Sequence, residues 1–293
     1  MLDVQFDPMR ADPAFPNVPA RWLLTAFAVV IAGVVGCAWL TLCLLYWQGS
    51  WQLLYHPQAK VTVTPAKVNL PFETVHFAAT DEGVTQLTGW WIPSGMPGVP
   101  MTVLYLHGVD GNLGDTLPAL SWLHQQGSNV FAIDYRGYGA SAAAKPTEAR
   151  MVEDVDWSLQ WLIANKNLPP ERIVVWGSGL GATLAAEAAD EHSRLAGVVL
   201  DEPREDAMNA VFHDARSHLV PAHWLATDRF DLDVAARRLQ VDSLWLLADG
   251  AAEPSAYQDV HVRKTAVWLK NPVEEDARAV AEWKRWLDGL STR

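Results

Sequence analysis

The chain has 293 residues, half of them hydrophobic and 19% charged, with a net charge of −12. This composition excludes a disordered tail, a small disulfide-stapled domain and a basic nucleic-acid-binding protein. Residues 1–47 carry a net charge of only −1, so the acidic surplus lies downstream, on a surface expected to be soluble and to avoid anionic lipid. Both cysteines, Cys37 and Cys43, lie in the apolar N-terminal stretch, which leaves the rest of the chain without thiol chemistry.

An N-terminal tail, residues 1–21, precedes a long uncharged run. The 26 residues from 22 to 47 would form a helix about 39 Å long, and a bilayer core needs about 30 Å. Aromatic residues flank the run at both ends, where their rings favour the headgroup level. We therefore predict one transmembrane helix over residues 22–47, with the lipid bilayer as its partner.

A cleaved signal is the alternative for this run, because residues 34–37 loosely resemble a lipoprotein processing box. The chain stays apolar over residues 38–47, however, and the first 20 residues hold more acid than base, which argues against cleavage. Arg10 and Arg21 lie closer to the span than the first lysines after it. The positive-inside rule therefore favours a soluble domain on the non-cytoplasmic side of the membrane.

Residues 48–71 contain three prolines and are predicted as a juxtamembrane linker before a domain over residues 72–293. Two strand-like segments, 72–79 and 87–92, are joined across Asp81-Glu82-Gly83, which predicts an antiparallel hairpin at one sheet edge. Apolar β-rich runs follow at 102–106, 130–133, 172–176, 197–200, 243–247 and 265–269. Most are separated by helical periodicity, and a last helix is expected over residues 275–290. This alternation predicts an α/β fold with a mostly parallel sheet and helices on both faces.

Ligands of parallel sheets bind at the carboxyl ends of the strands, so the turns after these runs are informative. One reads His107-Gly108-Val109-Asp110-Gly111-Asn112, and the next reads Asp134-Tyr135-Arg136-Gly137-Tyr138-Gly139. We expect Asp134 and Arg136 to form a structural ion pair. No group of histidine, cysteine and carboxylate residues has metal-ligand spacing, so neither a metal nor a cofactor is expected.

The order and spacing of these turns resemble the α/β-hydrolase superfamily. The chain is most similar to its membrane-anchored serine hydrolases, in which a span precedes Tyr-His-Pro, here 55–57, and an edge hairpin ending in Gly-Trp-Trp-Ile-Pro, here 89–93. The resemblance implies an α/β-hydrolase fold with a reduced cap over residues 203–233. It also implies an oxyanion turn, formed by His107, Gly108, Gly111 and Asn112, whose histidine is neither a base nor a metal ligand.

The family carries its nucleophile in Gly-x-Ser-x-Gly, at a strained turn between a strand and a helix. In this chain the flanking glycines are Gly177 and Gly181, and the residue midway between them is Gly179. Placing Ser178 in that frame would put Trp176 and Leu180 where glycines are needed. We therefore predict that Gly179 occupies the nucleophile position, that Ser178 is a polar loop residue, and that Gly177, Gly179 and Leu180 contribute to ligand binding.

The family's catalytic triad consists of a serine nucleophile, a histidine base and an orienting acid. The acid and the base are also not found at their expected positions. The acid should follow strand 243–247, where Ala251 or Ala252 aligns with the carboxylate, and Asp249 or Glu253 could substitute. The base should be a histidine within residues 270–273, yet no histidine follows His261. That histidine precedes the last strand, whose length of about 20 Å separates it from the site.

These absences favour a pseudohydrolase that binds an acyl-containing ligand or a protein partner without turnover. One alternative is an active esterase or acyl thioesterase that uses Ser178 with a base from the cap: His213, His218 or His223. Another is a dinucleotide-binding protein, because Gly177-x-Gly179-x-x-Ala182 opens a helix after a strand and Asp201 ends the next strand. No nucleic-acid partner is expected.

Overall fold

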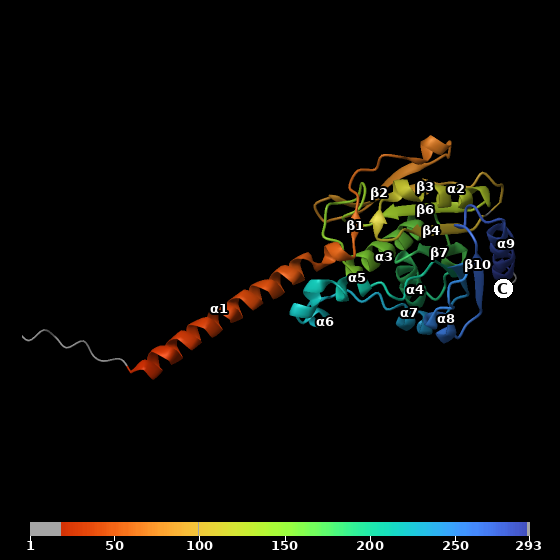
Figure 1. The fold of residues 1–293 in the computed structure, drawn as a ribbon. Coiled ribbons are helices and arrows are strands. Elements are labelled where there is room, and N and C mark those ends of the chain that lie inside the picture. The colour runs from red at the N-terminus through yellow and green to blue at the C-terminus, as the bar shows by residue number, and fades with distance from the viewer. Residues whose placement is uncertain (1–18, 99, 292–293) are drawn as a thin grey trace, which may run out of the picture.

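The computed structural model describes residues 19–98 and 100–291. A long helix, α1 (Ala20–Gly49), projects from an α/β body (Figure 1). It is long and apolar enough to cross a membrane, and most of its side chains are exposed. The predicted span of residues 22–47 lies within this helix. Residues 1–18 of the predicted tail fall outside the described residues.

The body is built on an eight-stranded sheet in the order β10-β9-β8-β7-β4-β6-β3-β2. Six neighbouring strands are parallel, while β3 pairs antiparallel with both β6 and β2 at one edge. The strands are β2 (Glu73–Ala79), β3 (Thr85–Ile92), β4 (Thr102–Leu106), β6 (Asn129–Asp134), β7 (Ile173–Ser178), β8 (Gly197–Asp201), β9 (Ser243–Ala248) and β10 (Lys264–Leu269). The predicted hairpin and all six predicted apolar strands are therefore present, with ends displaced by two residues at most.

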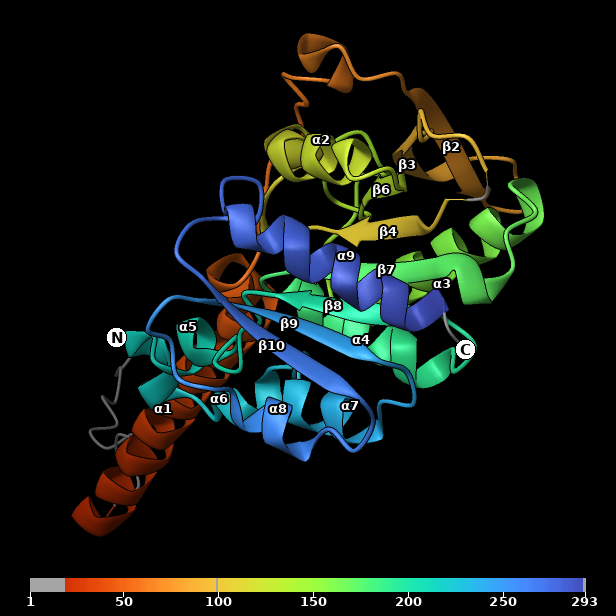
Figure 2. The ribbon, with the colours of Figure 1, turned by 90° about the vertical axis from the view of Figure 1, so that its right-hand side faces the viewer.

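Helices cover both faces of the sheet (Figure 2). One face carries α2 (Leu117–Gln125) and α9 (Ala277–Ser291), and the other carries α3 (Glu148–Asn165), α4 (Gly181–Glu191), α7 (Leu232–Arg238) and α8 (Ser255–Asp259). Side chains alternate along each strand, so Val174 and Trp176 of β7 face α2 and α9, whereas Ile173 and Val175 face α3 and α4. Two hydrophobic clusters, one on each face, form the core.

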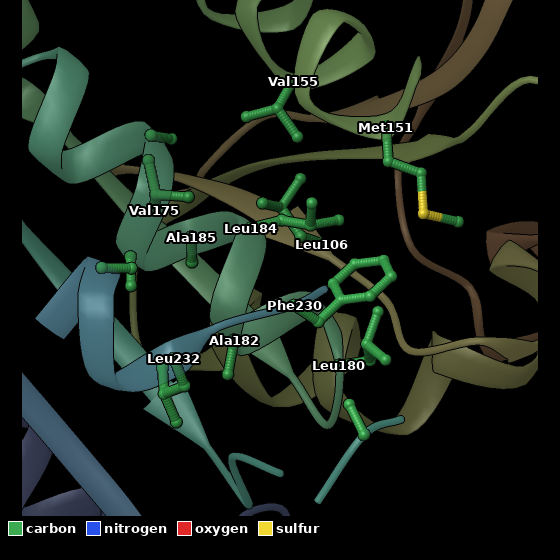
Figure 3. Close-up of a cluster of buried hydrophobic side chains, with 14 of the residues drawn as sticks. Leu106, Met151, Val155, Val175, Leu180, Ala182, Leu184, Ala185, Phe230 and Leu232 are labelled. Atoms are coloured by element: carbon green, nitrogen blue, oxygen red, sulfur yellow. The ribbon is translucent and has the colours of Figure 1, made fainter. Parts of the chain in front are cut away.

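The two clusters differ in composition. The α2/α9 side contains Trp122, Trp176, Trp283 and Trp286, whose neighbouring ring centroids lie 5.5 to 6.4 Å apart. On the opposite side the small residues of α4 allow it to approach the sheet closely. Figure 3 shows Leu180, at the start of α4, pointing toward Phe230 from the segment before α7.

The predicted cap contains short helical pieces: α5 (Asn209–Phe212), the 3-10 helix η5 (Ala215–Leu219) and α6 (Ala222–Leu225). It packs against the C-terminal part of α1, as Figure 1 shows for α6. The indole Nε1 of Trp39 donates to the carbonyl oxygen of Leu219 at 3.0 Å, and the hydroxyl of Tyr46 donates to that of Val211 at 2.8 Å. The cap therefore contacts α1 as well as the body.

Residues 48–71, predicted as a linker, pack against the domain. They contain η1 (Ser50–Leu53), β1 (His56–Pro57) and η2 (Pro65–Val68), and β1 pairs in parallel with β5 (Asp110–Gly111). Two further 3-10 helices are η3 (Leu113–Thr116) and η4 (Pro170–Arg172). Tyr55 is buried, and its hydroxyl donates to Asp228 Oδ2 at 2.8 Å. The prolines did not prevent pairing, because His56 still donates its backbone N–H to Val109.

Candidate functional site

The turn between β7 and α4 has the geometry of a strand–turn–helix elbow. Gly179 has a φ of +58°, in the left-handed region that glycine adopts without a steric penalty. A Cβ on Gly177 would lie 2.0 Å from the carbonyl oxygen of Gly181, and one on Gly181 would lie 2.5 Å from that of Leu106, so packing requires both flanking glycines. At Gly179, in contrast, a Cβ would meet nothing within 4 Å. A side chain at Gly179 would therefore have room but would be strained by the positive φ, and this is the position that the sequence analysis predicts for the family's nucleophile.

Ser178 is the last residue of β7. Because side chains alternate along a strand, its side chain points to the same face of the sheet as Val174 and Trp176, the face covered by α2 and α9. Ser178 lines the cleft described below together with Tyr105 and Asp201, and Asp201 lies opposite it in the pairing of β7 with β8. Asp201 Oδ2 also accepts a long hydrogen bond, 3.4 Å, from Nε1 of Trp176. Burial raises the pKa of Asp201 to about 7, and burial also raises the pKa of the Tyr105 hydroxyl. Ser178 therefore shares the cleft wall with a phenol and with a carboxyl group that holds its proton to a higher pH than an exposed aspartate does.

His107 shapes the turn after β4, as the resemblance implied. Its buried ring packs against those of Tyr135 and Tyr138, at centroid distances of 4.6 and 5.2 Å, and the two tyrosine rings also contact each other. Nδ1 is 2.7 Å from the carbonyl oxygen of Gly108, and because a carbonyl only accepts, Nδ1 carries the hydrogen. Burial lowers the pKa of His107, so the ring is neutral at neutral pH.

The predicted ion pair between Asp134 and Arg136 is wrong. The carboxylate of Asp134 accepts from the backbone N–H groups of Leu113 and Ala140, so it holds two turns together. Arg136 instead binds Asp154 of α3, with Nε at 2.6 Å from Oδ1. The sequence could not separate these partners, because Asp154 lies 18 residues further along the chain.

Gly111 and Asn112 of the predicted oxyanion turn have structural roles. Gly111 pairs with Pro57 in the small β1–β5 sheet. Asn112 caps η3 by accepting from Gly114 N–H, and its Nδ2 donates to the carbonyl oxygens of Gln58 and Lys60. These two residues hold the segment after α1 against the domain and lie outside the cavity lining described next.

A cavity of about 260 Å³, here called the cleft, lies at the carboxyl edge of the sheet. It is bounded by the His107 turn, the end of β7, the end of β8 and the segment before α9. Its lining consists of Tyr105, His107, Gly108, Asp110, Asp115, Thr116, Pro118, Ala119, Ser178, Asp201, Glu202, Pro272, Val273 and Glu274. Five of these residues are acidic, and the lining residues from the predicted base segment and its C-terminal neighbour are proline, valine and glutamate.

The remaining candidate residues lie outside the cleft. Asp249 and Glu253 are exposed and do not line it. The three cap histidines, His213, His218 and His223, are exposed as well. His213 contacts the carbonyl oxygen of Asn209, 3.2 Å from Nδ1, and His223 stacks on Phe212 with ring centroids 4.1 Å apart. Tyr105, Glu202 and Glu274 were not predicted as site residues, since only the strand order brings them together.

Solved structures share this fold. An esterase from Pyrococcus furiosus matches 82% of the chain and 97% of its own length, with a TM-score of 0.60 and 20% identity. An alpha-beta hydrolase from Vibrio vulnificus matches 77% of the chain and 82% of its own length, with a TM-score of 0.59 and 18% identity. The chain therefore has the α/β-hydrolase fold.

Residues 99–241, just under half of the chain, match the family described as serine aminopeptidase, S33. The uncharacterized protein YfhR of Escherichia coli O157:H7 is 32% identical over 134 residues, which cover 44% of this chain and 46% of that protein. Protein bem46 of Schizosaccharomyces pombe is 32% identical over 140 residues, which cover 47% of this chain and 46% of that protein. The chain thus spans about half the length of the curated relatives it matches.

Proposed function

We propose that this chain is a membrane-anchored, non-catalytic member of the superfamily, which binds a ligand at the cleft without turnover. The observation that carries the proposal is the pair of vacated triad positions. Gly179 presents no side chain at the elbow, and Pro272, Val273 and Glu274 line the cleft where the base would stand. A serine hydrolase needs nucleophile, base and orienting acid as a unit, and their loss leaves a binding cleft.

An active hydrolase built on Ser178 is less well supported. A serine nucleophile needs a base within hydrogen-bond reach, and none of the three cap histidines lines the cleft. His107 does line the cleft, and its hydrogen on Nδ1 leaves Nε2 as the nitrogen that could accept a proton. That Nε2 is buried, lies 3.8 Å from Asp134 Oδ1 and makes no hydrogen bond to Ser178. Asp201 is the remaining candidate to accept the Ser178 proton, so the test below keeps a Ser178 variant.

A dinucleotide site is also less well supported. Pyrophosphate binding requires free backbone N–H groups at the glycine turn. The N–H of Gly179 donates to the carbonyl oxygen of Asp201 at 2.8 Å, so it is not available to a phosphate. The five acidic residues of the cleft lining would repel the pyrophosphate as well.

The lining also bears on which ligand class the cleft accepts. Asp110, Asp115, Asp201, Glu202 and Glu274 give it a negative character, which disfavours a free fatty acid or another anion. We infer that an acyl-containing ligand would present a neutral or positively charged group here, or that a protein partner would present a basic side chain.

Membrane anchoring by α1 is part of the same proposal. It is supported by the length and apolar composition of the helix and by its exposure outside the body. The non-cytoplasmic placement of the domain remains a prediction from Arg10 and Arg21. Protease protection in sealed vesicles tests this orientation. Digestion of the domain by protease added on the cytoplasmic face would show that the domain lies on the cytoplasmic side.

The test of catalytic loss is labelling of the full chain, in detergent micelles, by a fluorophosphonate probe. Wild type, Ser178→Ala, Gly179→Ser and a control, Ser193→Ala, would be compared, with folding of each checked by circular dichroism. We expect no labelling of wild type, and none of Gly179→Ser, because a new serine would still lack a base. Labelling of wild type that disappears in Ser178→Ala, but persists in Ser193→Ala, would refute the proposal.

A further inference from the structure

The cap contains an uncharged stretch in an otherwise acidic domain. No Asp, Glu, Lys or Arg occurs over residues 217–226, and charged residues flank it closely at Arg216 and Asp228. Within the stretch, Leu219 is 60% exposed and Trp224 is 88% exposed, the highest value among the large hydrophobic side chains of the described residues. A tryptophan this exposed contributes no packing to the body, so its apolar surface lacks a partner within the described chain.

The uncharged stretch lies against the part of α1 proposed to enter the bilayer. The indole of Trp39 donates to the carbonyl oxygen of Leu219, and the hydroxyl of Tyr46 donates to that of Val211. Tyr46 belongs to the aromatic end of α1, where rings favour the headgroup level. Trp39 precedes it by seven residues, or about 10 Å along a helix, so its level is that of the hydrocarbon.

The polarity of the cap changes along the same direction. The ion pair of Asp214 and Arg216, 2.7 Å between Oδ1 and Nε, follows Val211 and thus lies near the level of Tyr46. Leu219, within the uncharged stretch, lies beside the deeper Trp39. The two indole and phenol hydrogen bonds also satisfy cap carbonyl groups that would otherwise lose their water partners on entering lipid.

We propose that the cap is a second membrane contact, in which Leu219 and Trp224 insert into the leaflet that surrounds the C-terminal end of α1. We assign lipid to this apolar surface because it is continuous with α1, whose own apolar side chains are mostly exposed. Trp224 suits this role, since its ring has an apolar body and one polar N–H for the headgroup region. This inference rests on the proposed membrane anchoring by α1.

The experiment uses the full chain in phosphatidylcholine vesicles, with the fluorophore NBD on a single cysteine and nitroxide-labelled lipid as quencher. Trp224→Cys would be made in a Cys37→Ser, Cys43→Ala background, where its exposure means that no packing is lost. Val84→Cys, 57% exposed in the hairpin between β2 and β3, is the matched control. Native Cys37, exposed on α1, reports on the anchor itself in a Cys43→Ala background.

We expect nitroxide lipid to abolish most of the fluorescence at positions 37 and 224 and to leave position 84 unchanged. Quenching at 37 with position 224 behaving like position 84 would overturn this inference and leave the anchor intact. A blue-shifted but unquenched probe at 224 would indicate a protein partner, such as a second copy, and would overturn it as well. Absence of quenching at position 37 would refute membrane anchoring by α1 and, with it, the membrane contact of the cap.

Discussion

The contribution of Asp201 to the unfolding free energy of the chain should fall as the pH rises toward 8. Burial raises the pKa of Asp201 to about 7 in the folded chain, whereas an unfolded aspartate titrates near 3.9. Between these two values the folded state holds a proton that the unfolded state has released. Each pH unit in this window therefore removes about 1.4 kcal/mol of unfolding free energy, and the loss ends above the folded pKa.

The variant Asp201→Asn isolates this contribution, because an amide has nearly the same shape and does not titrate. Between pH 5 and pH 8 the wild type should lose about 3 kcal/mol more unfolding free energy than the variant. Urea unfolding of the full chain in micelles, followed by far-UV circular dichroism at both pH values, measures the difference. Burial also raises the pKa values of Glu187 and Asp154, to about 7 and about 6, but these groups act equally in both proteins.

Asp249→Asn, at an exposed carboxylate after β9, is the matched control and should keep the wild-type pH dependence. If Asp201→Asn also kept it, the carboxyl group would titrate normally and the account of the buried cleft acid would be refuted.

Five further substitutions, in three tests, probe the elbow, the ion pairs of Arg136 and the segment after α1 by their effect on the free energy of unfolding. Gly177→Ala should cost more than about 3 kcal/mol, because the Cβ would overlap Gly181, whereas Gly179→Ala should cost about 1 to 2 kcal/mol from its left-handed backbone alone. Equal losses would contradict this distinction. Asp154→Ala should cost about 3 to 5 kcal/mol, because it removes the buried carboxylate that accepts from Nε and from the backbone N–H of Arg136. Glu153→Ala, which removes the exposed partner of the same arginine, should cost under about 1 kcal/mol. Tyr55→Phe should cost about 1 to 3 kcal/mol through the lost bond to Asp228; an unchanged urea midpoint would show that the segment after α1 does not contribute to stability.

The strands could be predicted well because a parallel strand buried on both faces is apolar at nearly every position. β4, for example, is buried at all five residues, and its predicted limits equal the observed ones. The elbow glycines were also predictable, since close backbone packing at Gly177 and Gly181 excludes any side chain.

The cleft was less predictable, because its lining depends on which strands become neighbours. Tyr105 and Asp201 meet at Ser178 only because β4 and β8 flank β7, an order that the chain sequence does not encode locally. The structural role of Asn112 was also not predictable, because it depends on a contact distant in sequence. Its glycine-containing turn is typical of ligand binding, but its side chain donates to a segment more than 50 residues earlier.

In the membrane-anchored chain proposed above, the hydrogen bonds from Trp39 and Tyr46 to the cap mean that α1 cannot be exchanged for an arbitrary transmembrane segment. One residue inserted between them would rotate Trp39 by about 100° about the helix axis and shift it by 1.5 Å relative to Tyr46. Both donors could not then reach their carbonyl partners. The length of the helix and the rotational positions of Trp39 and Tyr46 on it therefore define how the domain is oriented on the bilayer. A chimeric anchor of equal hydrophobicity would keep the domain at the membrane but would not fix its orientation.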